Sequence, residues 1–290
     1  MQGTREIRRR IRTVRSIQQI TRAMQMVAAS RFKRVESRVF AARPYRVLIR
    51  ELLENLVASV PYLSHPLLAR REAKRVGLVL ISADRGLCGA YNTNIIRETQ
   101  QFITSTSHGE LRLVLIGKKG HTFFQRRSYE IEMFEPLPPM QEAFGLTQQI
   151  VEGLTQGYEE ERFDEVHLFY TQFKTAMHSV PTRLRLLPME SPEGGGGARI
   201  GEPLFEPSAE EIAVTLLPRY LEAQVYGALL ESAASEQGAR MVAMKNATEN
   251  AEEMISDLTM TYNKARQAAI TKEILEIVSG AEALGEVRGT

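Results

Sequence analysis

The chain has 290 residues, of which 43% are hydrophobic and 25% charged, a composition typical of a folded protein of about two domains. Its single cysteine, Cys88, excludes a disulfide within the chain and fits a reducing compartment. No run approaches the ~18 apolar residues of a membrane-spanning helix. The net charge is only +2, but residues 1–46 contain thirteen Arg or Lys and two acids. A basic segment of this kind usually faces an acidic partner surface, nucleic acid or anionic lipid.

The first 57 residues show one long helical periodicity. A heptad-like seam with spacings of three and four is formed by Ile7, Ile11, Val14, Gln18, Thr21, Met24 and Ala28. We expect Ile17, Ile20, Val27 and Val35 to widen this seam. Pro44 is expected to bend the helix, after which Leu48, Leu52 and Leu56 continue the apolar stripe.

Two other readings of the basic segment are disfavoured. A transit peptide is also rich in arginine, but this segment has a coherent apolar stripe and no evident cleavage site. Nucleic-acid binding would call for interleaved aromatic or base-reading side chains, which the segment lacks.

The middle of the chain alternates strands and helices. After a loop at 62–75, a continuous apolar run at 76–82 predicts a strand buried on both faces. Further strands are predicted at 111–116, 165–171 and 182–188, and helices through about 102, at 121–127 and at 143–160. This order predicts a Rossmann-like α/β domain over 76–190 with a mainly parallel sheet.

The end of the chain is a second long helical stretch. Ser208 and Glu211 form a capping-box pattern that begins it, and Gly280 is the expected stop. Its seam has the spacing of a coiled coil and comprises Ala251, Ile255, Leu258, Tyr262, Ala265 and Ala269. We therefore predict the α/β class, with a long antiparallel coiled coil of helices 1–57 and 208–284 and the α/β domain inserted between them. The alternative, in which each helix packs separately on the middle domain, leaves helices too long for that domain to cover.

The sequence offers little chemistry. The turn from Gly86 to Gly89 lies where phosphate-binding loops occur, but it lacks both the dinucleotide fingerprint and the P-loop ending. The five histidines have no metal-ligand spacing, and Cys88 is expected to be a buried structural thiol. We expect no cofactor, no metal and no catalytic residue.

Several motifs carry a family resemblance. They are TREIRRRI at 4–11, QITRAMQMVAAS at 19–30, SADRGLCGAYN at 82–92, SEQGARMVAMKNAT at 235–248 and YNKARQAAIT at 262–271. Together they resemble the gamma subunits of bacterial F-type ATP synthases, over essentially the whole chain. The resemblance implies a central rotor shaft, not itself catalytic, that couples rotation of the c ring to ATP synthesis or hydrolysis in a ring of three alpha and three beta subunits.

The resemblance also implies roles by position. Arg266, Gln267 and Thr271 would contact a beta-subunit loop, and Arg22 and Met24 would lie against an acidic beta-subunit loop, to which the charge of Arg8, Arg9 and Arg10 is attracted. Glu236 and Arg240 would couple to the surroundings of Met24. Leu204, Phe205 and Glu206 would form a foot on the c ring and the epsilon subunit; the tyrosines frequent there in the family are absent from this chain.

The implied location is the cytoplasmic face of a bacterial cell membrane, where the chain would be peripheral and bind no nucleic acid. The chain lacks the inserted cysteine pair of the chloroplast form, so thiol control is not expected. Two alternatives remain open: a structural coiled-coil adaptor without a rotary role, and an α/β enzyme that uses its helices to form oligomers.

Overall fold

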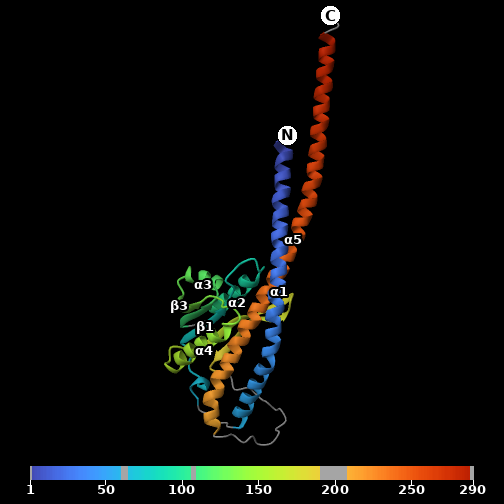
Figure 1. Ribbon diagram of the computed structural model, residues 1–290. Helices are drawn as coiled ribbons and strands as arrows, with labels where there is room; N and C mark the ends of the chain where they lie inside the picture. Colours follow the sequence, from blue (N-terminus) through green and yellow to red (C-terminus); the bar gives the residue numbers. More distant parts are fainter. Residues whose placement is uncertain (1, 60–64, 106–108, 190–207, 288–290) are drawn as a thin grey trace. The chain divides into compact units, whose positions relative to one another are not determined.

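The computed structural model describes residues 2–59, 65–105, 109–189 and 208–287 (Figure 1). The two long helices are α1, Gln2–Ser59, and α5, Ala209–Val287. Between them lie η1 (Pro66–Leu68), β1 (Arg75–Ile81), α2 (Tyr91–Ser105), β2 (Glu110–Ile116), α3 (Lys118–Gln125), β3 (Glu130–Glu135), α4 (Ala143–Glu159), β4 (Glu165–Thr175) and β5 (His178–Leu187). The chain divides into two compact units, residues 28–240, here called the α/β unit, and residues 1–27 with 241–290, called the shaft unit.

The α/β unit is built on a five-stranded sheet in the order β3-β2-β1-β4-β5. The first four strands are parallel and β5 is antiparallel to β4. Strand β1 is central, and every residue from Val76 to Ile81 is buried. The continuous apolar run therefore predicted the central strand correctly, because a strand covered by helices on both sides has no solvent face.

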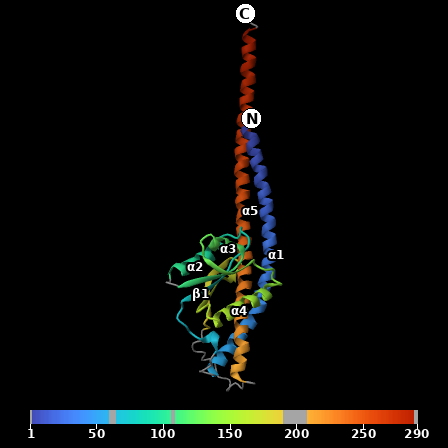
Figure 2. The same cartoon turned by 90° about the vertical axis from the view of Figure 1, so that its left-hand side faces the viewer.

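The sheet is covered on both faces, as Figures 1 and 2 show. On one face, Leu78 and Leu80 pack with α2 and α3 through residues such as Ile95 and Phe124. On the other face, Val79 and Ile81 share a core with α4, the end of α1 and the start of α5. The predicted α/β class with a Rossmann-like domain is confirmed.

Some predicted elements differ from the structure. Strand β3 was not expected, because three of its six residues, Glu130, Glu132 and Glu135, are charged. It is an edge strand, where charge discourages pairing with other chains. Helix α3 begins at Lys118 rather than 121. Strands β4 and β5 are both longer than predicted and form one hairpin.

The apolar stripes of the long helices also need correction. Leu48 and Leu52 are 58% and 57% exposed, whereas Leu56 is buried as predicted, together with Ile49 and Leu53. Helix α1 continues through Pro44. The helix face that packs into the core therefore does not include Leu48 and Leu52, two of the three leucines in the predicted stripe. The expected stop at Gly280 is wrong, because α5 runs to Val287.

The shaft unit consists of the beginning of α1 and the last part of α5. Arg8 lies over the ring of Tyr262, and Thr21 shares a hydrogen bond of 2.8 Å with Thr248, so the helices run antiparallel. Every described seam position predicted on the two helices is buried or half-buried while its neighbours are mostly exposed, which confirms the antiparallel coiled coil. Ile17, Ile20 and Val27 do not widen the seam, since they are 48%, 59% and 52% exposed.

One buried carboxylate fastens the beginnings of β1 and β4. Asp164 Oδ2 accepts hydrogen bonds from the backbone N–H groups of Arg75 (2.8 Å) and Lys74 (3.2 Å), and its Oδ1 accepts one from Arg75 Nη2 at 2.8 Å. Burial raises the pKa of this carboxyl, but the hydrogen bonds from Arg75 and Lys74 outweigh it and hold the pKa below its ordinary value.

We expect Asp164→Asn to lower the free energy of unfolding at pH 7 by about 2–4 kcal/mol, because it leaves Arg75 and two backbone donors poorly paired. A carboxyl with a lowered folded pKa stabilises the fold above its unfolded pKa of about 4, and this contribution is lost as pH falls through the folded pKa. Urea unfolding at pH 7 and pH 3 should therefore show a difference between wild type and variant that narrows in acid. A difference that is absent at pH 7, or equal at both pH values, would contradict this account.

Candidate functional site

Among the described residues, none packs a partner helix against positions 271–278 near the end of α5 in the shaft unit. Residues 271–278 are all exposed, and Figure 1 shows α5 continuing beyond the first residues of α1. The exposed side chains here include five large apolar ones, namely Ile270, Ile274, Leu275, Ile277 and Val278. We call residues 270–278 the α5 tip. Exposed apolar groups gathered on one helix end are typical of a surface that another protein covers.

The predicted beta-contact residues fall into two groups along the shaft unit. Arg266, Gln267 and Thr271 are exposed on α5 at or next to the tip. Arg22 is exposed on α1, and Met24 is half-buried one turn from the Thr21–Thr248 pair. Because Arg8 lies opposite Tyr262 and Thr21 opposite Thr248, the helices hold these two groups at different heights.

The arginines near the start of α1 point their charge outward. Arg8, Arg9 and Arg10 are all exposed. Arg10 pairs with Glu6 at 2.7 Å on the same helix, an exposed pair that contributes little to stability. The shaft unit therefore presents a basic surface beside an apolar seam.

Glu236 and Arg240, the two predicted coupling residues, form a buried ion pair on α5. Arg240 Nη2 lies 2.6 Å from Glu236 Oε1, and their side chains are 11% and 7% exposed. The same Nη2 also donates to the backbone carbonyl of Gly86 at 3.4 Å. The pair is thus held against the turn that follows β1, so the structure brings these two residues to the α/β unit.

The turn after β1 is shaped to meet α5. Leu87 and Gly89 both have positive φ, and the Asn92 side chain fixes the turn by accepting from Ala83 N–H at 2.9 Å and donating to Cys88 Sγ at 3.2 Å. Cys88 is 1% exposed and packs with Tyr91 and Ala239. Burial raises the pKa of its thiol, although nearby Arg240 opposes this. The prediction of a buried structural thiol is confirmed.

Helix α5 also occupies the crevice where a doubly wound sheet normally binds ligands. The strand order reverses between β1 and β4, and ligands of such sheets lie beyond the carboxyl ends of the strands at that point. Here Ser232 and Ser235 of α5 hydrogen-bond the backbone of Thr171 in β4. Tyr91 is buried nearby, and burial, together with the charge of Glu236, raises its pKa. The crevice is filled by the chain's own polar groups.

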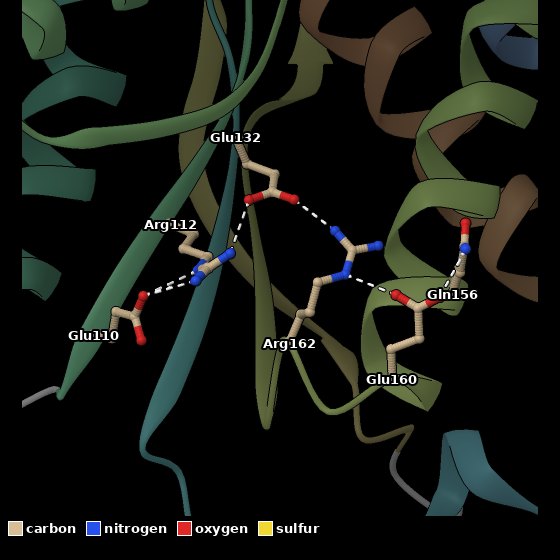
Figure 3. A network of polar contacts seen from close by, with 6 residues as sticks. All are labelled: Glu110, Arg112, Glu132, Gln156, Glu160 and Arg162. Atoms are coloured by element: carbon tan, nitrogen blue, oxygen red, sulfur yellow. Dashed lines mark hydrogen bonds and ion pairs between the residues drawn. The ribbon is translucent and has the colours of Figure 1, made fainter.

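A second polar cluster is a network of ion pairs and hydrogen bonds in the α/β unit (Figure 3). Its members come from β2, β3 and the end of α4, and they are Glu110, Arg112, Glu132, Gln156, Glu160 and Arg162. Glu132 is shared, at 3.2 Å from Arg112 and 2.6 Å from Arg162. Acids and arginines alternate along the network, which links the edge strand β3 to the segment after α4, and its three glutamates outnumber its two arginines by one.

Sequence reasoning missed the polar positions of α5 in the α/β unit. Gln224, Glu231 and Ser232 lie in an apolar run and are 9%, 6% and 1% exposed. The available signal was a carboxylate inside an otherwise apolar stretch, Ala228 to Ala234, because a buried charge needs a partner.

Other predicted features give limited results. Over the described part of the chain, no three His, Cys, Asp or Glu side chains gather as metal ligands would, and none of its helices has the length and apolar character to cross a membrane. The predicted foot, Leu204, Phe205 and Glu206, lies outside the described residues.

Two long terminal helices paired in an antiparallel coiled coil, with an α/β domain between them in the sequence, define a protein of the α/β class with a two-helix coiled coil. Comparison with known proteins makes the class specific. A family model described as ATP synthase matches residues 3–284. Proteins named ATP synthase gamma chain from Desulfitobacterium hafniense and Heliobacterium modesticaldum are 48% and 47% identical to this chain, each covering 98% of it and 100% of the relative. The chain belongs to the ATP synthase gamma chain family.

Solved structures agree with the fold. A central stalk and c-ring structure of Tetrahymena thermophila mitochondrial ATP synthase contains a chain with 29% identity and a TM-score of 0.59, covering 79% of this chain and 99% of its own. A Euglena gracilis mitochondrial ATP synthase structure contains a chain with a TM-score of 0.69 over 99% of this chain and 96% of its own. The latter is only 19% identical and supports the fold alone.

Cys88 should react slowly with thiol reagents in the folded protein. Because burial raises its pKa and closes access, we expect modification of the native chain at pH 8 to be at least about tenfold slower than in urea. A matched control is Thr93→Cys in a Cys88→Ser background, which places a thiol at an exposed position of α2 and should react quickly in both states. Equal rates for native and unfolded Cys88 would contradict the buried turn.

Proposed function

We propose that this chain is the central rotor shaft of an F-type ATP synthase. In this role it couples ion-driven rotation of the c ring to conformational change, and so to ATP synthesis or hydrolysis, in a ring of three alpha and three beta subunits. The observation that carries the proposal is the α5 tip, which extends the antiparallel pair of helices and exposes five large apolar side chains that no described part of the chain covers. Such a tip suits a sleeve made by other subunits.

The proposed shaft does no bond chemistry. A partner shifts a conformational equilibrium only by contacting its states unequally, and an asymmetric two-helix rod offers a different face to each of three neighbours. The filled crevice between β1 and β4 favours this reading, because the α/β unit uses its ligand position to hold α5. Nucleotide chemistry then belongs to the beta subunits.

We assign the contacts with the beta subunits to side chains of the shaft unit that are mostly exposed. Arg266, Gln267 and Thr271 meet a beta-subunit loop, and Arg22 with Met24 meets an acidic beta-subunit loop. Both groups are solvent-accessible in the chain except for the half-buried Met24. The positive field of the α1 arginines attracts the acidic loop over a distance of about 8–10 Å.

The c ring and the epsilon subunit are the other partners that we assign, and their contacts lie outside the shaft unit. Glu236 and Arg240, which form a buried ion pair on α5, couple to the surroundings of Met24. The segment with Leu204, Phe205 and Glu206 is the foot on the c ring, and the epsilon subunit binds beside it. The protein is then peripheral to the cytoplasmic face of a bacterial cell membrane, held there through the c ring, and has no nucleic-acid partner.

Reconstitution tests the proposal. The purified chain should restore ATP hydrolysis to a mixture of alpha and beta subunits that is inactive without it, and a probe on the chain should rotate during hydrolysis. An ATP-independent activity of the isolated chain would favour an α/β enzyme. Failure to bind or activate the alpha–beta mixture would favour a coiled-coil adaptor.

Neutralising the basic surface tests the electrostatic contact. We expect the triple substitution of Arg8, Arg9 and Arg10 to glutamine to lower ion-driven ATP synthesis by roughly two- to tenfold at low salt, with a smaller deficit at high salt where screening already weakens the contact. Arg31, Lys33 and Arg34 are also exposed on α1, and their replacement by glutamine removes the same charge elsewhere as a control. Unchanged synthesis in the first variant, or an equal loss in the control, would reject the assignment.

A further inference from the structure

Strand β4 has a free edge beyond its neighbour β1. The pairing of β1 with β4 ends at Leu80 and Phe169, whereas β4 continues to Thr175 with β5 on its other side. Backbone groups along this extension therefore have no strand partner on the side of β1. Buried backbone groups without partners are costly, so something else has to satisfy them.

Side chains of α5 take the place of the missing strand. Ser232 Oγ accepts a hydrogen bond from Thr171 N–H at 3.2 Å, and Ser235 Oγ donates to the Thr171 carbonyl at 3.2 Å. Glu231 Oε2 accepts from Phe173 N–H at 3.2 Å. We call these three α5 side chains and the β4 backbone they bind the joint. It is a ladder of three directional bonds between a helix and a strand edge.

Glu231 extends the joint to the second long helix. Its Oε1 accepts from Arg46 Nη1 of α1 at 2.6 Å, and Arg46 Nη2 donates to Gln224 at 3.2 Å. One carboxylate thus bridges α1, α5 and β4. Its side chain is 7% exposed, so both of its oxygens depend on these protein partners.

Two glycines of α5 permit the close approach. A Cβ at Gly227 would lie 2.6 Å from Arg46 Cδ, and one at Gly238 would lie 2.7 Å from the backbone oxygen of Ala176 in the β4–β5 turn. The joint is therefore bounded by close contact at both ends. Apolar surfaces are non-directional and tolerate sliding, whereas hydrogen bonds weaken steeply when they are misaligned, so this joint resists rotation of α5 about its own axis.

We propose that Glu231, together with Ser232 and Ser235, acts as a positioning group that locks α5 in one rotational register on the α/β unit, so that torque applied to that unit passes to the shaft at this joint. The inference rests on the proposed rotary function and goes beyond it, because it names the residues through which the α/β unit grips the helix. Glu231 touches no substrate; it acts through the helix that it holds.

Angular fluctuation of single assembled complexes tests the joint. A bead attached at Gln125→Cys, an exposed position of α3, in a Cys88→Ser background reports the angle of the α/β unit relative to a fixed alpha–beta ring. We expect Glu231→Gln and, separately, Ser235→Ala to raise the angular variance by roughly 1.5-fold, since each removes about one of three bonds that share the load. The rate of ATP hydrolysis should stay near that of the parent complex.

The matched control is Glu222→Gln. This residue also lies on α5 and pairs with an arginine, Arg219 at 2.8 Å, but the pair stays within one helix and bridges no elements. Its variance should equal that of the parent. Hydrogen exchange supplies a second readout in the same complexes: the Phe173 amide should lose protection in Glu231→Gln, while the sheet amides of β1 keep theirs.

The outcomes separate the joint from the rotary function. The proposed role of the joint is rejected if the parent complex rotates and both joint variants have the same angular variance as the parent. It is also rejected if Glu222→Gln raises the variance equally. Either result leaves the proposed rotary function unaffected. A parent complex that hydrolyses ATP without rotating overturns the rotary function and the joint with it.

Discussion

The antiparallel pairing of the first and last helices is the constraint on which the rest of the structure depends. Its contacts join residues far apart in the sequence; Thr21 and Thr248, for example, are 227 positions apart. The segment between them must therefore fold so that the last helix comes back beside the first. The α/β domain is inserted between them, and one face of its sheet shares a core with the end of α1 and the start of α5. The seam includes small side chains such as Ala28 and Ala251, which are buried and leave room for a neighbouring helix to approach closely. A loss of this pairing would remove the packing of the apolar helix faces, from which most helical stability in proteins comes.

The two units differ in how their helices are held. In the shaft unit the contacts are a narrow seam, and most of the surface of both helices is exposed. In the α/β unit α5 is buried almost all round from Ala223 to Gly238 and makes polar contacts that fix its orientation. This contrast suits a part that must be gripped at one place and turn freely at another. A charge-bearing joint is stabilising only when every group is paired, and Glu231 has partners for both of its oxygens.

Much of the fold could be predicted from the sequence, for identifiable reasons. The seams of both helices and the central strand β1 follow simple periodicities that tertiary contacts reinforce. The edge strand β3 was missed because half of its residues are glutamates, which suit an exposed edge but make the local sequence look like a loop. Leu48 and Leu52 were placed on the wrong face, since the helix seam shifts where α1 leaves one partner surface and meets another. The joint depends on the free edge of β4, and that edge exists only once the lengths of β1 and β4 are known.

The most direct test of the account is a covalent link across the seam of the assembled rotor. Thr21→Cys with Thr248→Cys, in a Cys88→Ser background, places two thiols where the hydroxyl oxygens lie 2.8 Å apart, a geometry compatible with a disulfide. Because the two helices turn as one body in this account, oxidation should form the disulfide quantitatively. ATP-driven rotation should then be as fast as in the same complex before oxidation. The account would be contradicted if the disulfide failed to form. It would also be contradicted if forming the disulfide stopped rotation while the complex continued to hydrolyse ATP at its former rate.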